Sequence, residues 1–234
     1  MTNNRLIPQF TPDCTKKEVV IGLFWLVMHM FVCPLLINQL PQDTNPITVN
    51  GLYYGVSLAV TLTFGMSLLR REFDHLMDRT FHCVKSFFAA YFFWYAMSLA
   101  MVAALTALEW SQDLPNDMAM DVLAQENYRV TLTISVIAAP ILEEILFRGI
   151  LFQSIRKHSR LWTYAASIGL FGLYHVWQFA YLYQDWTYLL YALQYIPITL
   201  ALTWSYEHSG SLWVPIFFHA SNNYMAMQVL QIMT

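Results

Sequence analysis

Long apolar stretches alternate with short polar segments along the whole chain. Seven stretches of about 20 residues can be recognised, at 19–40, 51–69, 84–108, 130–152, 161–183, 186–206 and 212–231. A helix needs about 20 such residues to cross the roughly 30 Å hydrocarbon core of a bilayer. The pattern predicts an all-α polytopic transmembrane helix bundle of seven to eight membrane helices, eight if Pro140 kinks the fourth stretch and splits it.

Composition agrees with a membrane environment. The 234 residues are 57% hydrophobic and 12% charged, whereas a soluble domain carries about a quarter charged residues. Mean hydropathy is +0.43. The net charge of −3 and the scattered basic residues exclude nucleic acid as a partner and leave the lipid bilayer as the surroundings.

The chain shows no internal repeat and no low-complexity tract, so we expect one membrane-embedded domain over 19–234. Residues 1–18 are expected to be a cytosolic lead-in, because they lack the apolar core and cleavage site of a signal peptide. The three cysteines have no pairing or metal-binding spacing, which predicts free thiols at Cys14, Cys33 and Cys83.

Basic residues lie almost entirely in alternate connecting segments. Ten precede the first stretch or follow the second and fourth: Arg5, Lys16, Lys17, Arg70, Arg71, Arg79, Lys85, Arg156, Lys157 and Arg160. The other loops, 41–50 and 109–129, carry only Arg129. The positive-inside rule then predicts a cytoplasmic N-terminus and an external C-terminus. Short loops without extra domains are typical of a bacterial plasma-membrane protein.

Ionisable residues inside the apolar stretches are the candidates for function. The fourth stretch contains "APILEEILFRG", with Glu143, Glu144 and Arg148, and each charge there costs roughly 2.5–3.5 kcal/mol on insertion scales. Glu144 and Arg148 are four residues apart and can pair on one helical face. Glu143 lies about 100° around the helix and stays free for chemistry.

Two further stretches supply the partners. "FGLYH" ends in His175, and "FFHASNN" places His219 and Asn223 one helical turn apart, with Asn222 as a possible substitute. A carboxylate and an imidazole can take a proton from water, while an imidazole and an amide can stabilise an oxyanion. The remaining histidines are interpreted as satisfied interior or loop residues: His29, His75, His82, His158 and His208.

These motifs, EExxxR, FxxxH and HxxxN in that order, resemble the CAAX-protease and bacteriocin-processing (CPBP, or Abi) intramembrane endopeptidases. The resemblance covers about 130–230 and places the catalytic motifs in 130–231. It implies a glutamic-type membrane protease acting on prenylated CAAX proteins, bacteriocin or pheromone precursors, or other membrane-associated peptides.

By motif position, the resemblance implies that Glu143 is the general base and that His175 acts beside it. His219 and Asn223 would stabilise the oxyanion. Three residues would support the site: Glu144, Arg148 and Phe171, the last by orienting the imidazole that follows it.

A metal is not expected, because no HExxH is present. Zinc remains the alternative, with Glu143, His175 and His219 as ligands and Glu144 as the base. The alternative function is a non-catalytic membrane protein, such as a proton-coupled transporter or a peptide-immunity factor. The ionisable groups gather in the second half of the chain and are almost missing from the first three stretches, which favours the enzyme.

Residue counting predicts how deep the site lies. At 1.5 Å per residue, Glu143 lies about 13 Å and His219 about 10 Å from the inner face, whereas His175 lies about 21 Å from it. The first two depths predict a water-filled cavity open to the cytoplasm, with substrate entering from there or from the inner leaflet. The greater depth of His175 is attributed to a late start, a tilt or an irregular helix in the fifth stretch.

Overall fold

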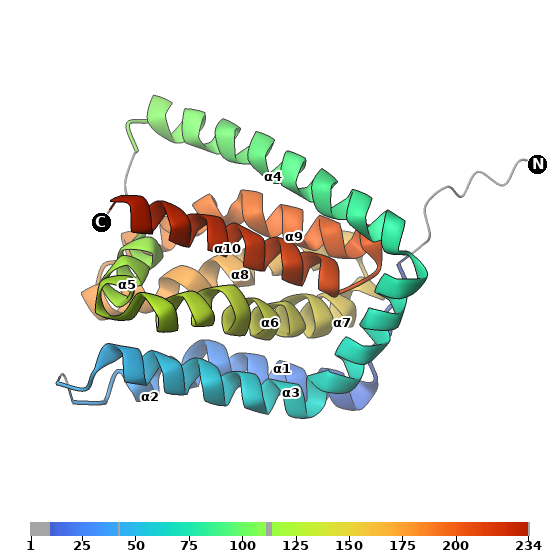
Figure 1. The fold of residues 1–234 in the computed structure, drawn as a ribbon, viewed down its shortest axis with the longest axis horizontal. Helices are drawn as coiled ribbons and strands as arrows, with labels where there is room; N and C mark the ends of the chain where they lie inside the picture. The colour runs from blue at the N-terminus through green and yellow to red at the C-terminus, as the bar shows by residue number, and fades with distance from the viewer. Residues whose placement is uncertain (1–9, 42, 111–113, 234) are drawn as a thin grey trace, which may run out of the picture.

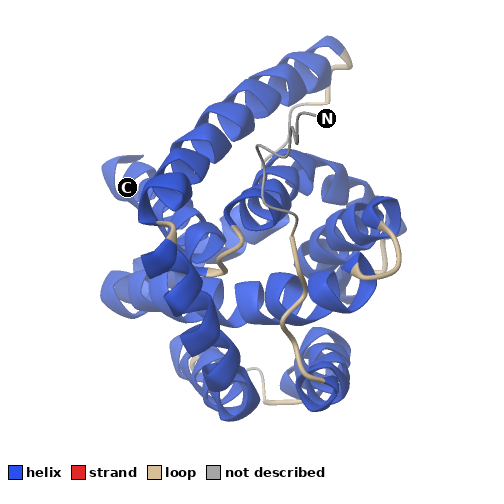
Figure 2. Cartoon of the chain, turned by 90° about the vertical axis from the view of Figure 1, so that its right-hand side faces the viewer, coloured by secondary structure: helices blue, strands red, loops and turns tan. Residues whose placement is uncertain are grey.

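A computed structural model describes residues 10–41, 43–110 and 114–233, and every element in these ranges is helical (Figure 2). The predicted all-α class is therefore confirmed. Half of the expected lead-in, residues 1–9, lies outside the described residues.

The first half of the chain forms three long helices. The first is continuous through α1 (Lys16–Val27), a π-helical turn η1 (Met28–Val32) and α2 (Cys33–Ile37). It is followed by α3 (Pro46–Asp78) and α4 (Thr80–Ala107). Figure 1 shows α1–α3 as a layer along one side of the bundle, whereas α4 leans away from the other helices toward its C-terminal end.

The second half contains the central helix and the helices that cover it. The central helix runs through α5 (Pro115–Thr133), the π-helix η2 (Ile134–Ala138), α6 (Ala139–Glu144), the π-helix η3 (Ile145–Phe152) and α7 (Gln153–Arg156). Then come α8 (Arg160–Tyr183), the 3-10 helix η4 (Trp186–Tyr195), α9 (Ile196–Ser209) and α10 (Trp213–Met233). In Figure 1, α6 and α7 run between the α1–α3 layer and α8–α10.

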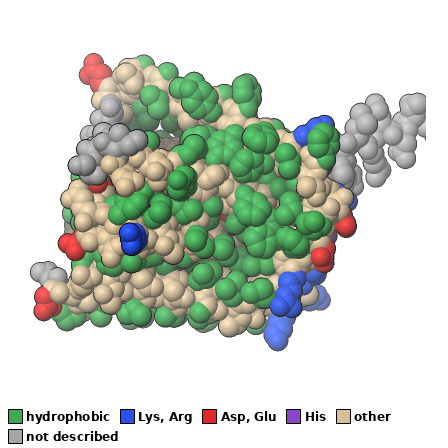
Figure 3. Space-filling model, viewed as in Figure 1, with side chains coloured by type: hydrophobic (Ala, Val, Ile, Leu, Met, Phe, Trp, Pro, Cys, Tyr) green, Lys and Arg blue, Asp and Glu red, His purple; other side chains and the backbone are tan. Residues whose placement is uncertain are grey.

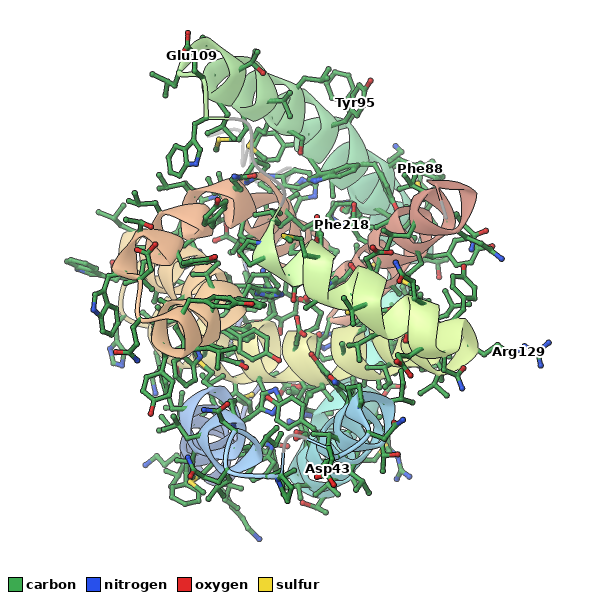
Figure 4. The ribbon with its side chains drawn as sticks, turned by 90° about the vertical axis from the view of Figure 1, so that its left-hand side faces the viewer. Asp43, Phe88, Tyr95, Glu109, Arg129 and Phe218 are labelled. Atoms are coloured by element: carbon green, nitrogen blue, oxygen red, sulfur yellow. The ribbon has the colours of Figure 1, made fainter. Side chains whose placement is uncertain are left out.

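Four described helices are long and apolar enough to cross a membrane: Lys16–Ile37, Pro46–Asp78, Thr80–Ala107 and Pro115–Arg156. The three remaining predicted stretches are also helical, but Trp, Tyr, His and Gln side chains make them less apolar. Lys and Arg side chains gather at the end where α3 ends and α10 begins (Figure 3). At the opposite end, Arg129 points away from the bundle (Figure 4). Which end faces the cytoplasm stays a prediction.

Two boundaries differ from the sequence prediction. The first helix begins at Lys16 rather than residue 19, because Thr15 and Glu18 form a reciprocal capping box. The segment 109–129, expected as a loop, is mostly helical from Pro115 onward among its described residues. Pro115 starts this helix as its first residue, where the missing N–H costs nothing.

Pro140 does not split the fourth stretch. The helix widens to a π-helix just before it, so that the Ala139 N–H bonds to the Ile134 carbonyl. The next bond of this register would join Pro140 to the Ser135 carbonyl, but proline has no N–H. The helix is instead interrupted at Asn127, with φ −157° and ψ 90°, where two helical segments meet at a kink. The Asn127 Oδ1 atom accepts from the Val130 N–H, close to the predicted start of the fourth stretch.

The η3 segment of the central helix is enclosed on all sides. Every residue of η3 is buried, which is typical of a helix inside a bundle. Glycines allow α3 to approach it closely: a Cβ at Gly65 would lie 2.9 Å from Ile145 Cγ2, and one at Gly149 would lie 2.8 Å from Leu68 Cδ2. This contact fixes the height of α3 against the segment that follows Glu143.

Candidate active site

Three helices bring one carboxylate and two imidazoles together. Glu143 on α6 has its Oε2 atom 3.9 Å from His175 Nε2 on α8 and 3.9 Å from His219 Nε2 on α10. The side chains are 4%, 12% and 6% exposed, respectively. Glu143 Oε2 has no hydrogen-bond partner among the described residues. A separation of 3.9 Å is too long for a direct hydrogen bond and is suited to a shared water molecule.

Glu144 links the site to a buried cation. Its Oε1 atom accepts hydrogen bonds from Arg148 Nη1 at 3.0 Å and from His219 Nδ1 at 2.8 Å. Glu144 and Arg148 are both 0% exposed, so each charge depends on the other for compensation. Glu143 is thus left free while its neighbour is engaged.

The two imidazoles differ in what they face. Both Nδ1 atoms point at acceptors, His219 at the Glu144 carboxylate and His175 at the Phe171 carbonyl 2.9 Å away. A neutral ring must donate from the nitrogen that faces an acceptor, so each neutral ring presents a bare Nε2 atom to Glu143. Of the two Nδ1 atoms, only that of His219 faces a carboxylate.

Phe171 lies at the centre of the aromatic packing around the site. It is 1% exposed, and its ring centroid lies 4.6 Å from that of His175 and 5.9 Å from that of His219. The Arg148 guanidinium sits over the same ring at 4.5 Å. The Tyr195 ring also packs against His175, with 4.5 Å between the two ring centroids. Phe171 therefore contacts three of the predicted site residues at once.

Asn223 lies one turn beyond His219 but is held differently from the other predicted site residues. Its Nδ2 atom donates to the Ser135 carbonyl at 2.9 Å. This carbonyl is the one that the π-helix and Pro140 leave without a backbone donor. The Asn223 amide therefore joins α10 to the helix that carries Glu143, and one of its two hydrogens is used in doing so.

The first half of the chain contributes a polar network that the motifs do not reveal. His29 is 0% exposed. Its Nδ1 atom lies 3.2 Å from Ser57 Oγ, and its Nε2 atom lies 3.1 Å from the Tyr174 hydroxyl oxygen. The Tyr53 hydroxyl donates to the His29 carbonyl at 3.1 Å. Tyr174 in turn packs its ring edge-on against His175 at 5.0 Å.

This network agrees with the interpretation of His29 as a satisfied interior histidine. Two further buried ionisable groups, Glu18 and Glu72, lie just outside the first two apolar stretches. The only sequence signal was the presence of polar residues within apolar stretches, with Tyr53 and Ser57 one helical turn apart.

The depths deduced by residue counting need correction. Glu143 lies 13 residues from the helix end at Arg156, or about 20 Å, which agrees with the depth of His175 rather than that of His219. Helix α8 is regular from Arg160 onward and does not start late. The start of α10 is instead buried, with the Leu212 N–H bonded to Glu72 Oε2 at 2.9 Å. Counting from Leu212 therefore underestimates the depth of His219.

The same three side chains were considered as zinc ligands. Tetrahedral ligands about 2.1 Å from a zinc ion lie about 3.4 Å from one another, less than the 3.9 Å from Glu143 Oε2 to each Nε2 atom. Within the described ranges, no group of three or more His, Cys, Asp or Glu side chains is spaced closely enough to hold a metal ion as it stands. The absence of a metal stays a prediction.

Comparison with known proteins identifies the region that carries the site. Residues 125–225 match the family model described as type II CAAX prenyl endopeptidase Rce1-like. Searches of curated proteins and of solved structures gave no match. The matched range contains all of the predicted site residues: Glu143, Glu144, Arg148, Phe171, His175, His219 and Asn223. Residues 125–225 are therefore similar to the type II CAAX prenyl endopeptidases of the Rce1-like family.

Proposed function

We propose that this protein is an intramembrane endopeptidase in which Glu143 activates a water molecule for attack on a peptide carbonyl. The observation that carries the proposal is the unpaired Glu143 Oε2 atom, equidistant at 3.9 Å from two imidazole Nε2 atoms. A water molecule there would donate one hydrogen to Glu143 and one to an imidazole, which directs its oxygen lone pairs toward the substrate.

The surroundings of the two histidines divide the roles between them. His175 has a carbonyl behind it, so it acts as the neutral acceptor beside Glu143. His219 has the Glu144 carboxylate behind it, so it carries the proton and donates to the oxyanion. Asn223 adds its second amide hydrogen to the oxyanion while the first stays on Ser135.

Glu143 both accepts and returns the proton that is transferred in the reaction. The base takes a proton as the water oxygen bonds to the carbonyl carbon, and it returns that proton to the amide nitrogen as the C–N bond breaks. Glu144 and Arg148 hold His219 in position, and Phe171 orients both imidazoles by packing. No metal is required by this scheme.

The proposed substrates are membrane-associated: prenylated, bacteriocin-like or pheromone-like peptides. We place the protein in the bacterial plasma membrane with its N-terminus on the cytoplasmic side. Ten basic residues at one set of loops against one at the other support this orientation.

The test is cleavage of a farnesylated CAAX peptide by purified protein in detergent. Glu143→Gln keeps the size of the side chain and removes the base, so the rate is expected to fall by about 10²–10⁴-fold with an unchanged melting temperature. Glu126→Gln is the control for the same chemical change, because Glu126 is exposed and lies outside the site. Turnover of Glu143→Gln within tenfold of the parent contradicts the assignment of the base.

Two additions to this assay test the remaining parts of the proposal. Incubation with a zinc chelator, followed by zinc, is expected to leave the rate unchanged, and loss with recovery on zinc contradicts the metal-free scheme. A peptide of the same sequence without the farnesyl group is expected to be cleaved more slowly. Equal rates for the two peptides contradict selection for lipidated substrates.

A further inference from the structure

A groove lies between α3, α6 and the start of α10. It has a volume of about 580 Å³, within the range of ligand pockets. Its apolar walls are Leu58, Leu62, Met66, Leu69, Ile141 and Trp213. Ile141 is two residues before Glu143, about 200° around the helix, so this groove is on the side of α6 away from the candidate active site.

The groove is apolar along most of its length and charged at one end. From Leu58 to Leu69 its wall follows α3 for about 17 Å at 1.5 Å per residue. The lining then continues with Arg70 and Asp74, which are one helical turn apart and both exposed. Neither side chain takes part in an ion pair within the described part of the chain. The groove thus offers one free cation and one free carboxylate beyond an apolar trough.

An apolar trough that ends in two charged residues matches the acyl chain and headgroup of a membrane lipid. The charged end of the groove lies at the end of the bundle where Lys and Arg side chains gather (Figure 3). Basic residues mark the headgroup level of a bilayer, and the apolar trough lies on the side of the hydrocarbon core. A ligand aligned with the bilayer would place its chain along α3 and its polar group at Arg70 and Asp74.

We propose that this groove binds one acyl chain of a phospholipid with a zwitterionic, primary-ammonium headgroup, a phosphatidylethanolamine. The Arg70 guanidinium binds the phosphate through charge-assisted hydrogen bonds. The Asp74 carboxylate accepts hydrogen bonds from the ammonium, which a choline headgroup cannot donate. A headgroup with only a negative charge leaves Asp74 without a partner.

The bound acyl chain would contact all three elements that line the groove. Trp213 Nε1 already donates to the Leu69 carbonyl at 3.0 Å, which joins the start of α10 to α3. Ile141 adds α6 to the same wall. The lipid would cover the apolar surface of all three, so its affinity depends on the shape of the groove as well as on the two charges.

Native mass spectrometry of the delipidated protein, titrated in detergent with phosphatidylethanolamine, tests the proposal. The expected result is one lipid bound per chain with at least fivefold preference over phosphatidylcholine and phosphatidylglycerol. Met66→Trp fills the groove and is expected to weaken binding at least tenfold. Met77→Trp is the matched control, because Met77 is exposed on the same helix outside the groove.

The charged end is tested separately. Arg70→Gln is expected to weaken phosphatidylethanolamine binding three- to tenfold, with Lys85→Gln as the unaffected control. Asp74→Asn is expected to abolish the preference for ethanolamine over choline. The proposal is overturned if Met66→Trp binds lipid like the parent, or if the three lipids bind equally. Competitive displacement of the lipid by a farnesylated peptide also overturns it, since the groove would then belong to the substrate.

Discussion

Replacing Arg148 by methionine is expected to destabilise the bundle by about 3–5 kcal/mol, the cost of breaking a buried ion pair from one side. The guanidinium is 0% exposed, and it pairs with Glu144 at 3.0 Å and stacks on Phe171 at 4.5 Å. Methionine fills much of the same volume, so the loss comes mainly from the uncompensated Glu144 charge. For a chain of this length, about 2–4 °C per kcal/mol corresponds to a fall in melting temperature of roughly 6–20 °C.

The matched double variant, Arg148→Met with Glu144→Gln, removes both charges and is expected to recover most of the lost stability. Replacing both members of a buried ion pair by neutral residues changes the folding free energy little, whereas removing one member leaves the other charge uncompensated and is strongly destabilising. Thermal unfolding in detergent, followed by tryptophan fluorescence, compares both variants with the parent. The reasoning is refuted if Arg148→Met melts within 2 °C of the parent, or if the double variant is no more stable than Arg148→Met.

Three smaller changes test other parts of the structure. His29→Phe should cost about 1–3 kcal/mol in unfolding free energy, since the buried Tyr174 hydroxyl loses its partner; an unchanged melting temperature contradicts this. Burial, followed by nearby carboxylates, raises the pKa of Cys14 to about 12, so roughly one thiol in ten thousand is ionised at pH 8. With the other two cysteines replaced by alanine, a maleimide should therefore label the native protein far more slowly than the denatured protein, and equal rates would argue against this. Gly65→Ala places a Cβ 2.9 Å from Ile145 Cγ2 and should cost about 1–3 kcal/mol, whereas Gly55→Ala, with nothing within 4 Å, should be neutral.

The sequence by itself determined the helical class and predicted which side chains form the candidate site. Apolar stretches of membrane-spanning length can satisfy their backbone polar groups only as helices or closed barrels, and their polar residues recur at helical spacing. The four-residue spacing of Glu144 and Arg148 places them on one face in any helix, so their pairing needed no tertiary information. Helix ends were less predictable, because Thr15 and Glu18 cap each other beyond the apolar stretch.

Only the tertiary structure decided how the helices stand against one another. Residue counting follows one helix axis, and it could not detect that α10 starts inside the bundle against Glu72. The hydrogen bond from Asn223 to Ser135 depends on a π-helical register and on Pro140, in a helix 88 residues away along the chain.

The same holds for His29 and Tyr174, whose contact spans 145 residues. Helical periodicity is a local property that any short stretch expresses. The relative height and rotation of two helices depend on distant contacts, such as Gly65 against Ile145, which no single stretch of sequence contains. The sequence therefore named the residues of the site, and packing between distant segments decided which of their atoms face one another.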